Sequence, residues 1–432
     1  MPNLAISLLT LQRQYQKLKI MVNASIITIG DEILVGQTID TNSAWIAGQL
    51  RLIGIKVAEI ISISDDAATI KEAIDRELTK SKIIFITGGL GPTQDDITKK
   101  TLVDYFNDTL VMNPRILEKV EAMFKSINRP ILEVNRQQAM LPSKATIIEN
   151  DLGTASGMWF TKGDQSILSF PGVPFEMKGL VLKAIPLLQE KYPVPAFYHK
   201  TIHFQGIGES QLAHEIETIE TRCRTNGISV AYLPSPGIVK LRLTGTLNQQ
   251  AEIEATLNEL NTRFPEQAFG FEKDTLESVI GGILKKRNQT LGTVESCTGG
   301  AIAAQIVSIP GSSAYYKGSI VAYSYELKED LVGVNPKTLL EFGAVSQQVI
   351  EQMASNGLKN LKTDYCIATS GIAGPDGGTD LKPVGTVWIA VASAGKVVSK
   401  QFLFKHNRER NIELTVVYAL NFLRRTLLEQ EK

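Results

Sequence analysis

Residues 81–98 read SKIIFITGGLGPTQDDIT, and this stretch decides the fold of the first part of the chain. Its apolar first half is rich in β-branched residues, which is typical of a buried strand, and the glycines that follow predict a tight turn. Upstream, strand patterns at 24–30 and 56–63 alternate with amphipathic helical patterns at 41–54 and 66–80. This β-α-β-α-β order predicts an α/β fold with a doubly wound, mostly parallel sheet.

The chain has 432 residues, too many for one ordinary core, so two or three domains are expected. The α/β pattern continues to a closing helix at 174–192, and the prolines of KYPVPAFY at 191–198 predict a linker. Residues 199–264 have the pattern of a small α+β unit. A third region of helices and strands starts near Thr275 and ends in a long helix at 408–429.

The composition, with 43% hydrophobic and 21% charged residues, is that of a soluble globular protein. The 45 basic and 45 acidic residues cancel, which argues against nucleic acid or a membrane surface as a partner. Three widely spaced cysteines exclude a disulfide scaffold and favour the cytoplasm. No apolar run approaches the roughly 18 residues of a membrane-spanning helix. Residues 1–20 lack the order of a signal peptide, so we expect a peripheral helix there or a translation start at Met21.

Glycines and acids follow two strands of the first region. GDEILVGQTIDTNS (30–43) comes after the first strand, and TGGLGPTQDDIT (87–98) after the third. Because ligands bind beyond the carboxyl ends of parallel strands, we expect both loops, with the turn FPGVPFEM (170–177), to border one ligand site. The candidate site residues are Asp31, Glu32, Asp40, Asn42, Gly88, Gly89, Gly91, Thr93, Asp95, Asp96 and Glu176.

The acids of this set suit a divalent cation beside a phosphate, since Asp31, Glu32, Asp40, Asp95 and Asp96 offer hard carboxylate oxygens. The alternative is that the glycines only make tight turns and the acids only cap helices. Two acid clusters at adjacent strand ends favour the ligand site, and the alternative stays open.

The segment TVESCTGGAIAAQI (293–306) predicts a strand, a tight turn and a helix, with Ser296, Cys297 and Thr298 at the turn. Cys297 is a candidate nucleophile because a helix N-terminus lowers the pKa of a thiol, although a small buried cysteine is the commoner case. Thr298 suits a helix cap. The residues alone leave open whether Ser296, Cys297 or neither does chemistry.

A serine needs a base near pH 7, and with His406 the sole histidine of this region a Ser-His-Asp triad has little support. Lys328, with Tyr323 to orient it, is the economical alternative. The loop ATSGIAGPDGGTDLKPVGT (368–386) offers backbone amides for an oxyanion and a phosphate. Arg408, at the start of the last helix, could bind that phosphate through its forked guanidinium.

TGGLGPTQDD, GDEILVGQTIDTNS and FPGVPFEM together resemble the molybdopterin-binding-type (MoaB/MogA-like) domain of the CinA family. The resemblance implies a metal-dependent pyrophosphatase acting on ADP-ribose, with Mg, Mn or Co held by Asp31, Glu32, Asp95 and Asp96. GIGES (206–210) and YLPSPG (232–237) resemble the KH-like linker domain of the same family. An acid in the glycine loop and the lack of a basic stripe argue against RNA binding.

ESCTGG, GSSAYYKGSIVAYSYELK, GAVS, SGIAGPDGG and KPVGTV resemble, in order, the nicotinamide-nucleotide amidohydrolase (PncC-type) domain of CinA proteins. The resemblance implies cofactor-free hydrolysis of nicotinamide mononucleotide to nicotinate mononucleotide and ammonia. Ser296 would attack the amide carbon, Lys328 would accept the proton, and Tyr323 would assist. The implied substrate-binding residues are Thr298, Gly299, Gly300, Ser312, Ser313, Gly371, Gly374, Gly377 and Arg408.

Two positions depart from the pattern of the family. Ile412 stands where a second arginine usually follows Arg408, and Arg410 is the candidate replacement. Tyr325 stands where asparagine is commoner.

The expected organisation is an N-terminal extension (1–20), a MoaB/MogA-like pyrophosphatase domain (21–192), a KH-like linker domain (198–268) and an amidohydrolase domain (272–432). The family further implies a cytoplasmic homodimer in pyridine-nucleotide salvage, with no direct contact to nucleic acid or membrane. The alternative function is a nucleotide- or molybdopterin-binding regulatory protein without turnover, linked to competence or DNA damage.

Overall fold

The structure is a computed structural model that describes residues 22–93, 96–194 and 197–429. The expected N-terminal extension, Met21 and Asp95 lie outside these ranges. The chain divides between Tyr198 and His199 into two compact units. No helix in the described ranges has both the length and the apolar content that crossing a membrane requires.

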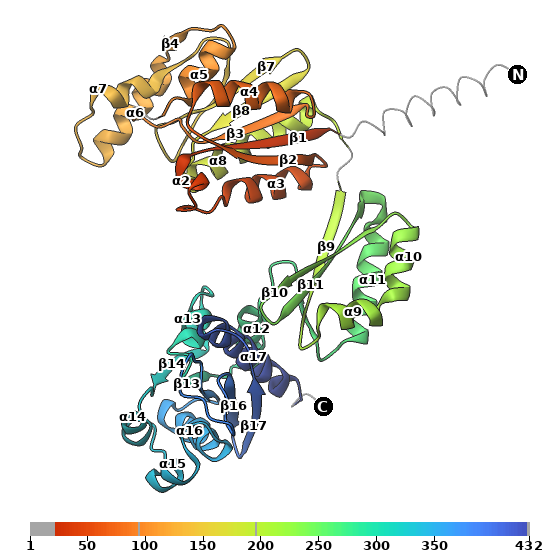
Figure 1. Ribbon diagram of the computed structural model, residues 1–432, viewed down its shortest axis with the longest axis vertical. Helices are drawn as coiled ribbons and strands as arrows, with labels where there is room; N and C mark the ends of the chain where they lie inside the picture. Colours follow the sequence, from red (N-terminus) through yellow and green to blue (C-terminus); the bar gives the residue numbers. More distant parts are fainter. Residues whose placement is uncertain (1–21, 94–95, 195–196, 430–432) are drawn as a thin grey trace, which may run out of the picture. The chain divides into compact units, whose positions relative to one another are not determined.

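The first unit is a six-stranded sheet with helices on both faces (Figure 1). The strand order is β2-β1-β3-β8-β7-β6, in which the first four strands are parallel and the last two antiparallel. This confirms the expected doubly wound, mostly parallel sheet. The strands and helices are β1 (Asn23–Ile29), α2 (Asp31–Leu34), α3 (Asn42–Leu52), β2 (Lys56–Ile63), α4 (Ala67–Leu78), β3 (Ile83–Thr87), α5 (Thr98–Tyr105), β6 (Thr146–Ile148), β7 (Gly157–Lys162), β8 (Gln165–Phe170) and α8 (Pro174–Lys191).

Neighbouring residues of the central strands face opposite sides of this sheet. Ile26 and Phe85 pack against α3 and α8, whereas Ile27 and Ile84 pack against α4 and α5. Because both faces are covered, the central strands are apolar without alternation, as in the run at 83–87. The loops that follow β1, β3 and β8 therefore meet at one edge of the sheet.

Residues between α5 and β6 form an addition with a small core of its own, made of Ile116, Val120, Ala139 and Leu141. The sequence patterns did not single it out. It projects beyond one end of the sheet (Figure 1). Its elements are β4 (Leu110–Met112), α6 (Pro114–Ser126), α7 (Glu133–Arg136), the 3-10 turn η1 (Gln137–Ala139) and β5 (Met140–Pro142).

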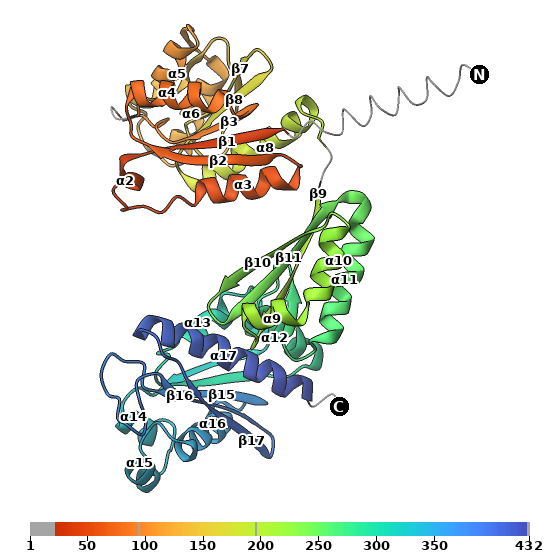
Figure 2. The ribbon, with the colours of Figure 1, turned by 45° about the vertical axis from the view of Figure 1, so that its right-hand side comes forward.

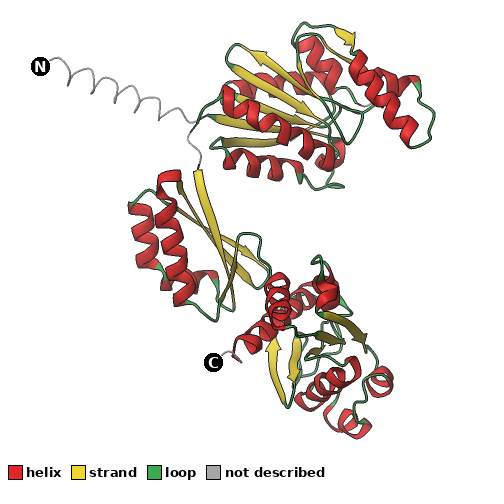
Figure 3. Ribbon diagram, turned by 180° about the vertical axis from the view of Figure 1, so that it is seen from behind, coloured by secondary structure: helices red, strands yellow, loops and turns green. Residues whose placement is uncertain are grey.

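The second unit begins with a four-stranded sheet in the order β10-β11-β9-β12, which carries its helices on one face (Figure 3). This confirms the small α+β middle segment. Its elements are β9 (Phe197–Gln205), α9 (Glu209–Glu215), α10 (Glu217–Thr225), β10 (Ser229–Ser235), β11 (Ile238–Thr246), η2 (Leu247–Gln249), α11 (Gln250–Arg263) and β12 (Ala268–Phe271).

The unit continues with a five-stranded sheet in the order β14-β13-β15-β16-β17. Its first three strands are parallel, and β16 and β17 are antiparallel. The helices α12, α13 and α17 cover one face, and α15 and α16 the other (Figure 2). The elements are α12 (Leu276–Arg287), β13 (Leu291–Glu295), α13 (Ala301–Val307), η3 (Ser312–Ala314), β14 (Tyr316–Val321), α14 (Tyr325–Asp330), α15 (Pro336–Phe342), α16 (Gln347–Leu361), β15 (Tyr365–Gly371), β16 (Thr386–Ser393), β17 (Lys396–Leu403) and α17 (Arg408–Glu429).

The helix α17 also binds the middle segment. Asn421 donates its side-chain amide to Gln205. Arg424, which is 2% exposed, donates to Asn421 Oδ1 at 2.8 Å, to the Ala268 carbonyl at 3.3 Å and to the Glu266 carbonyl. Burial lowers the pKa of Arg424 to about 10. This network makes the middle segment and the C-terminal domain one unit.

Replacing Arg424 by alanine is expected to lower the free energy of unfolding of this unit by about 2–4 kcal/mol, because buried carbonyl oxygens lose their donors. Denaturant titration of the full chain measures the loss. The control is Arg425→Ala, since Arg425 is 40% exposed and pairs with the Glu266 carboxylate at the surface. Equal losses in both variants would contradict a structural role for the buried network.

Candidate functional site

A cavity of about 470 Å³ opens at the carboxyl ends of β1, β3 and β8 in the first unit. The expected three loops do border one cavity. Of the candidate residues, those that line it are Glu32, Asp40, Asn42, Gly88, Gly89, Gly91, Asp96 and Glu176. Asp31 and Thr93 are not among the lining residues, and Asp95 falls in a gap of the described ranges.

Glycine is required at the start of the second loop. Gly88 has φ +109°, and a Cβ atom added there would lie 2.1 Å from the Ile29 carbonyl oxygen. Its amide donates to the Phe170 carbonyl at 3.1 Å. The loop after β3 therefore passes directly against the end of β1, which brings its backbone to the cavity.

Two buried polar atoms of the lining residues have no hydrogen-bond partner within the described ranges, Asn42 Oδ1 and Thr87 Oγ1. Asn42 donates its amide to the Gly172 carbonyl at 2.7 Å, and this bond fixes the side chain. An unpaired buried polar atom costs about 1–3 kcal/mol. Polar groups of a ligand would offset that cost.

Two acids of the cavity, Asp40 and Glu176, accept local hydrogen bonds. Asp40 accepts from the Thr28 hydroxyl at 2.8 Å and from the Ser43 amide at 3.0 Å. Glu176 accepts from the Asn150 side-chain amide at 2.6 Å, and burial raises the pKa of Glu176. The described residues contain no group of three His, Cys, Asp or Glu side chains that could hold a metal ion.

The expected metal set is therefore not assembled by the described residues alone. Asp31 begins α2, and its amide donates to Asp65 at 3.2 Å, while its side chain is exposed. Glu32 and Asp96 both line the cavity and offer the hard oxygen donors that a divalent cation prefers. Two carboxylates are too few for such a cation, so a bound phosphate would have to supply further oxygen ligands.

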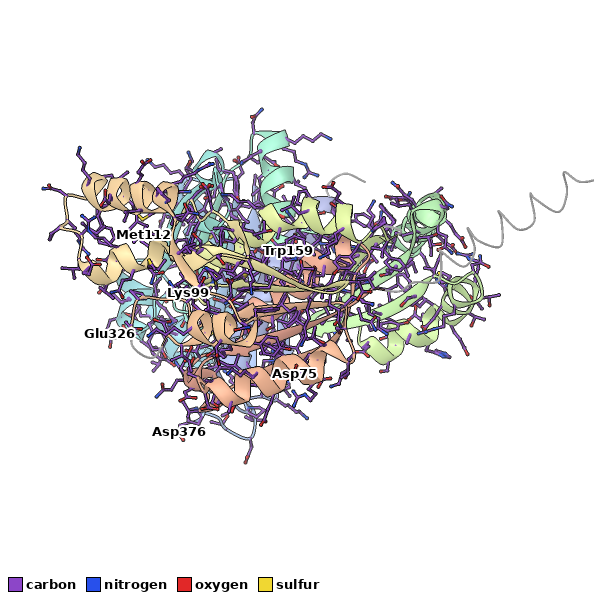
Figure 4. All side chains as sticks on the ribbon, turned by 90° about the horizontal axis from the view of Figure 1, so that it is seen from above. Asp75, Lys99, Met112, Trp159, Glu326 and Asp376 are labelled. Atoms are coloured by element: carbon purple, nitrogen blue, oxygen red, sulfur yellow. The ribbon has the colours of Figure 1, made fainter. Side chains whose placement is uncertain are left out.

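No lysine or arginine appears among the described residues that line this cavity. Lys99, labelled on α5 in Figure 4, follows the glycine loop, but its ammonium donates to the Gln137 carbonyl at 3.2 Å. Burial lowers the pKa of Lys99 to about 8. An anion in the cavity thus meets backbone amides, hydroxyls and carboxylates.

Sequence reasoning did not select six lining residues with polar side chains, Thr28, Thr38, Thr41, Asp65, Thr87 and Thr154. Thr38 and Thr41 belong to the loop 30–43, which the sequence singles out for its acids. Thr28 and Thr87 lie at the ends of buried apolar strands, and a hydroxyl in that position was the available signal. Asp65 and Thr154 come from loops that carry no motif.

In the second unit, Ser296 lies where β13 turns into α13. Gly299 and Gly300 have φ +59° and +98°, so the five residues between strand and helix can reverse the chain tightly. Ser296 is 7% exposed, and its amide donates to the Thr369 carbonyl at 3.0 Å. Its hydroxyl makes no hydrogen bond within the described residues.

The Lys328 ammonium lies at the same strand end. The side chain is 1% exposed, and Nζ donates to the carbonyls of Ala322, Tyr323 and Ser324 at 2.8, 3.0 and 3.3 Å. The Ala322 amide in turn donates at 2.8 Å to the carbonyl of Glu295, the residue before Ser296. Burial lowers the pKa of Lys328.

The two residues that follow Ser296 are both buried. Cys297 is 6% exposed, and burial raises the pKa of its thiol to about 12, which disfavours a thiolate nucleophile. The Thr298 hydroxyl lies 2.8 Å from that of Thr369. The cap position of α13 is Gly300, so the expectation that Thr298 caps this helix is wrong.

Arg408 joins two of the expected site elements. Its guanidinium donates to the Gly374 carbonyl at 2.7 Å and to the Tyr323 hydroxyl at 3.0 Å. Arg410 instead pairs with Glu413 at 3.1 Å. Arg408 therefore lies between the glycine loop and Tyr323, and its guanidinium has further N–H donors available. The Arg410 side chain pairs with a residue of its own helix, α17.

The remaining candidates lie on the glycine loop or elsewhere. Gly371 ends β15, and Gly374 and Gly377 have φ +93° and +88° in the loop that follows. Asp376, labelled in Figure 4, marks the exposed part of this loop. Tyr325, one of the two departures, accepts from the Ala344 amide at 3.3 Å and so connects α14 to the loop before α16.

Ser312 and Ser313 are not brought to Ser296 within one chain. They precede β14, whose first residue Tyr316 pairs with Leu291 at the start of β13. Ser296 follows the other end of that strand. Because the strands are parallel, the serines lie at the opposite end of the sheet, about 16 Å away at roughly 3.3 Å per strand residue.

The chain matches three family models in succession. They are "Probable molybdopterin binding domain" over residues 25–190, "Damage-inducible protein CinA KH domain" over 199–270 and "CinA C-terminal domain" over 273–427. Among solved structures, a CinA superfamily protein from Klebsiella pneumoniae is 33% identical, covering 36% of this chain and 96% of that chain with a TM-score of 0.35.

Curated relatives match over nearly their whole length. A CinA-like protein of Cytophaga hutchinsonii is 44% identical over 413 residues, which covers 94% of this chain and 99% of the relative. A protein of Halothermothrix orenii, described as a putative competence-damage inducible protein, is 38% identical over 410 residues, covering 94% and 98%. With such identity along the full length of its relatives, and with all three domains present in order, the chain belongs to the CinA family.

Proposed function

We propose that the C-terminal domain hydrolyses the carboxamide of nicotinamide mononucleotide to give nicotinate mononucleotide and ammonia. The observation that carries the proposal is that a buried serine, Ser296, and a buried lysine ammonium, that of Lys328, lie at the ends of the neighbouring parallel strands β13 and β14. The motifs of the amidohydrolase branch and the family membership support the same reaction class.

In the proposed reaction, Ser296 Oγ attacks the carboxamide carbon and Lys328 Nζ takes the hydroxyl proton. The tetrahedral intermediate then collapses, the carbon–nitrogen bond breaks, and the leaving nitrogen takes the proton from Lys328 to depart as ammonia. Water attacks the resulting ester by the same proton route and releases the carboxylate. The carbonyls that orient Lys328 fix the direction from which its nitrogen approaches.

The phosphate of the substrate is assigned to the loop 371–378 and Arg408. Arg408 already lies against Gly374 and Tyr323, so a phosphate beside it would also order Tyr323. The remaining guanidinium donors suit two phosphate oxygens.

Purified full-length protein should release ammonia from nicotinamide mononucleotide, measured by coupled glutamate dehydrogenase and by chromatography of the product. Nicotinamide riboside, which lacks the phosphate, is expected to react with a KM at least about 10-fold higher, since a charge-assisted bidentate contact is lost. Absence of ammonia release at high protein concentration would overturn the proposal.

The activity should depend on the protonation of Lys328. The neutral amine accepts the serine proton, so deprotonation activates the enzyme and the rate rises with pH. Because burial disfavours the ammonium, the activating pKa should lie below the ordinary lysine value of 10.5. A profile of kcat/KM from pH 6 to 10.5 checks this, and an activating pKa at or above 10.5 would contradict it.

A second function is proposed for the first unit, the metal-dependent cleavage of ADP-ribose to AMP and ribose 5-phosphate. Its specific support is the cavity at the strand ends, with the glycine loop at 88–91 and the unpaired Asn42 and Thr87 atoms. We assign Glu32 and Asp96 as the residues that would hold a Mg²⁺-class cation together with diphosphate oxygens. When bound, the cation would neutralise the diphosphate and activate water.

Removal of divalent metal with EDTA is expected to lower AMP formation from ADP-ribose by more than about 100-fold, since carboxylates alone would repel the diphosphate. Ammonia release from nicotinamide mononucleotide by the same sample should be unchanged. Restoring Mg²⁺, Mn²⁺ or Co²⁺ in parallel identifies the preferred metal. Nucleotide binding without product at any metal concentration would favour the alternative, a binding module without turnover.

A further inference from the structure

Glu295, the last residue of β13, directly precedes Ser296 and is fully buried. Its carboxylate accepts the backbone amides of Gly300 at 3.0 Å, Ile302 at 3.1 Å and Ala303 at 2.9 Å. These amides belong to the start of α13 and the residue before it. One side chain thus connects the strand on one side of the Ser296 turn to the helix on its other side.

Two hydroxyls complete the surroundings of this carboxylate. Thr293 on β13 and Ser319 on the neighbouring β14 both lie 3.4 Å from Glu295 Oε1. No lysine or arginine pairs with Glu295 among the described residues. Amide and hydroxyl dipoles therefore compensate the carboxylate, and the first amides of α13 are taken by the protein itself.

The backbone on both sides of the turn is held as well. The Glu295 carbonyl accepts from Ala322, whose own carbonyl accepts from Lys328 Nζ. The Ser296 amide donates to Thr369 on β15. Both ends of the turn are therefore fixed. The position of the Ser296 hydroxyl relative to Lys328 then depends on the conformation of the five-residue turn, which the Glu295 carboxylate ties to the start of α13.

We propose that Glu295 is a positioning residue for the Ser296 nucleophile. This proposal rests on the proposed amidohydrolase function, and it predicts that different groups bind the phosphate and position the nucleophile. Because Glu295 occupies the α13 amides, the phosphate binds at the loop 371–378, and Glu295 acts on the chemical step rather than on substrate affinity.

The decisive variant is Glu295→Gln, which keeps the shape but presents an amide group to backbone amides that need an acceptor. We expect kcat for ammonia release to fall about 100-fold while KM changes less than about 3-fold, as for a group that acts only in the transition state. The rate at which a fluorophosphonate labels Ser296, followed by mass spectrometry, should fall in parallel. This labelling needs no substrate.

The matched control is Thr275→Ala, which removes the side-chain cap of α12 in the same domain. It should lower the melting temperature slightly and leave kcat and labelling within 2-fold of the unmodified protein. Should Glu295→Gln not fold, Ser319→Ala removes one hydroxyl contact and no amide contact, and a 3- to 10-fold loss of labelling rate is expected.

Unchanged labelling and kcat in Glu295→Gln would overturn the proposal, as would a raised KM with unchanged kcat. If the unmodified protein releases no ammonia yet its Ser296 is labelled, the assigned substrate is wrong. In that case slower labelling in Glu295→Gln still supports positioning by Glu295, so the two failures are distinguishable.

Discussion

Replacing Ser296 by alanine is expected to lower ammonia release from nicotinamide mononucleotide by about 10³-fold or more, since the reaction loses its nucleophile. The substitution removes one oxygen that makes no hydrogen bond within the described residues, so the melting temperature should stay within a few degrees. Single-turnover assays with Ser296→Ala, run beside isothermal titration of the substrate, separate loss of chemistry from loss of binding.

Two companion variants decide how the serine is activated. The rate of ammonia release by Lys328→Met should fall as far as that of Ser296→Ala. The double variant should be no slower than either single variant, because the effects of residues that act as a unit are not additive. Its effect on folding has to be measured in parallel, since three carbonyls lose their donor. Independent, additive losses would place Lys328 outside the reaction.

Cys297→Ala is the matched control, because Cys297 adjoins Ser296 in the same turn and is also buried. A thiol whose pKa is raised to about 12 is a poor nucleophile near pH 7, so this variant should keep most of the rate. If Cys297→Ala releases no ammonia and Ser296→Ala remains active, the nucleophile has been assigned to the wrong residue.

Much of the fold follows from local patterns. β2 and α17 occupy the ranges that the sequence predicts, because β2 has a short β-branched run and α17 a long amphipathic repeat between clear breaks. Within residues 107–142, β4, β5 and α7 were harder to predict, because three-residue strands and a four-residue helix carry too few residues to show a period. The 13-residue α6 between them begins with an Asn-Pro cap, which was an available signal.

The candidate sites were predictable where chemistry lies within one motif and not where it depends on contacts between distant segments. The glycine loop and the Ser296 turn are each contiguous in sequence. The contact of Arg408 with Tyr323 joins residues 85 positions apart, and no spacing rule predicts it. Ser312 and Ser313 lie at the opposite end of the sheet from Ser296 because their motif runs along the whole of β14, and sequence alone does not show which end of a strand a motif residue occupies.

The second large effect is expected at Gly88 in the first unit. Gly88→Ala adds a Cβ atom 2.1 Å from the Ile29 carbonyl oxygen at a backbone φ of +109°. Left-handed strain of about 1–3 kcal/mol combines with overpacking of about 1–3 kcal/mol against backbone that cannot rotate away. The loop should shift away from β1, and AMP formation from ADP-ribose should fall by more than about 100-fold, as expected when a preorganised site is displaced by about 1 Å.

Gly36→Ala is the matched control for Gly88→Ala. Gly36 also has a positive φ of +77°, but a Cβ atom there would meet nothing within 4 Å. It therefore carries the strain without the clash and should cost about 1–2 kcal/mol of stability with little loss of activity. Denaturant titration and the ADP-ribose assay, run on both variants, separate the two causes. Equal losses of ADP-ribose cleavage in both variants would show that backbone strain alone matters and that the contact between the glycine loop and β1 does not shape the site. If Gly88→Ala loses ADP-ribose cleavage but still releases ammonia from nicotinamide mononucleotide, the effect is confined to the first unit.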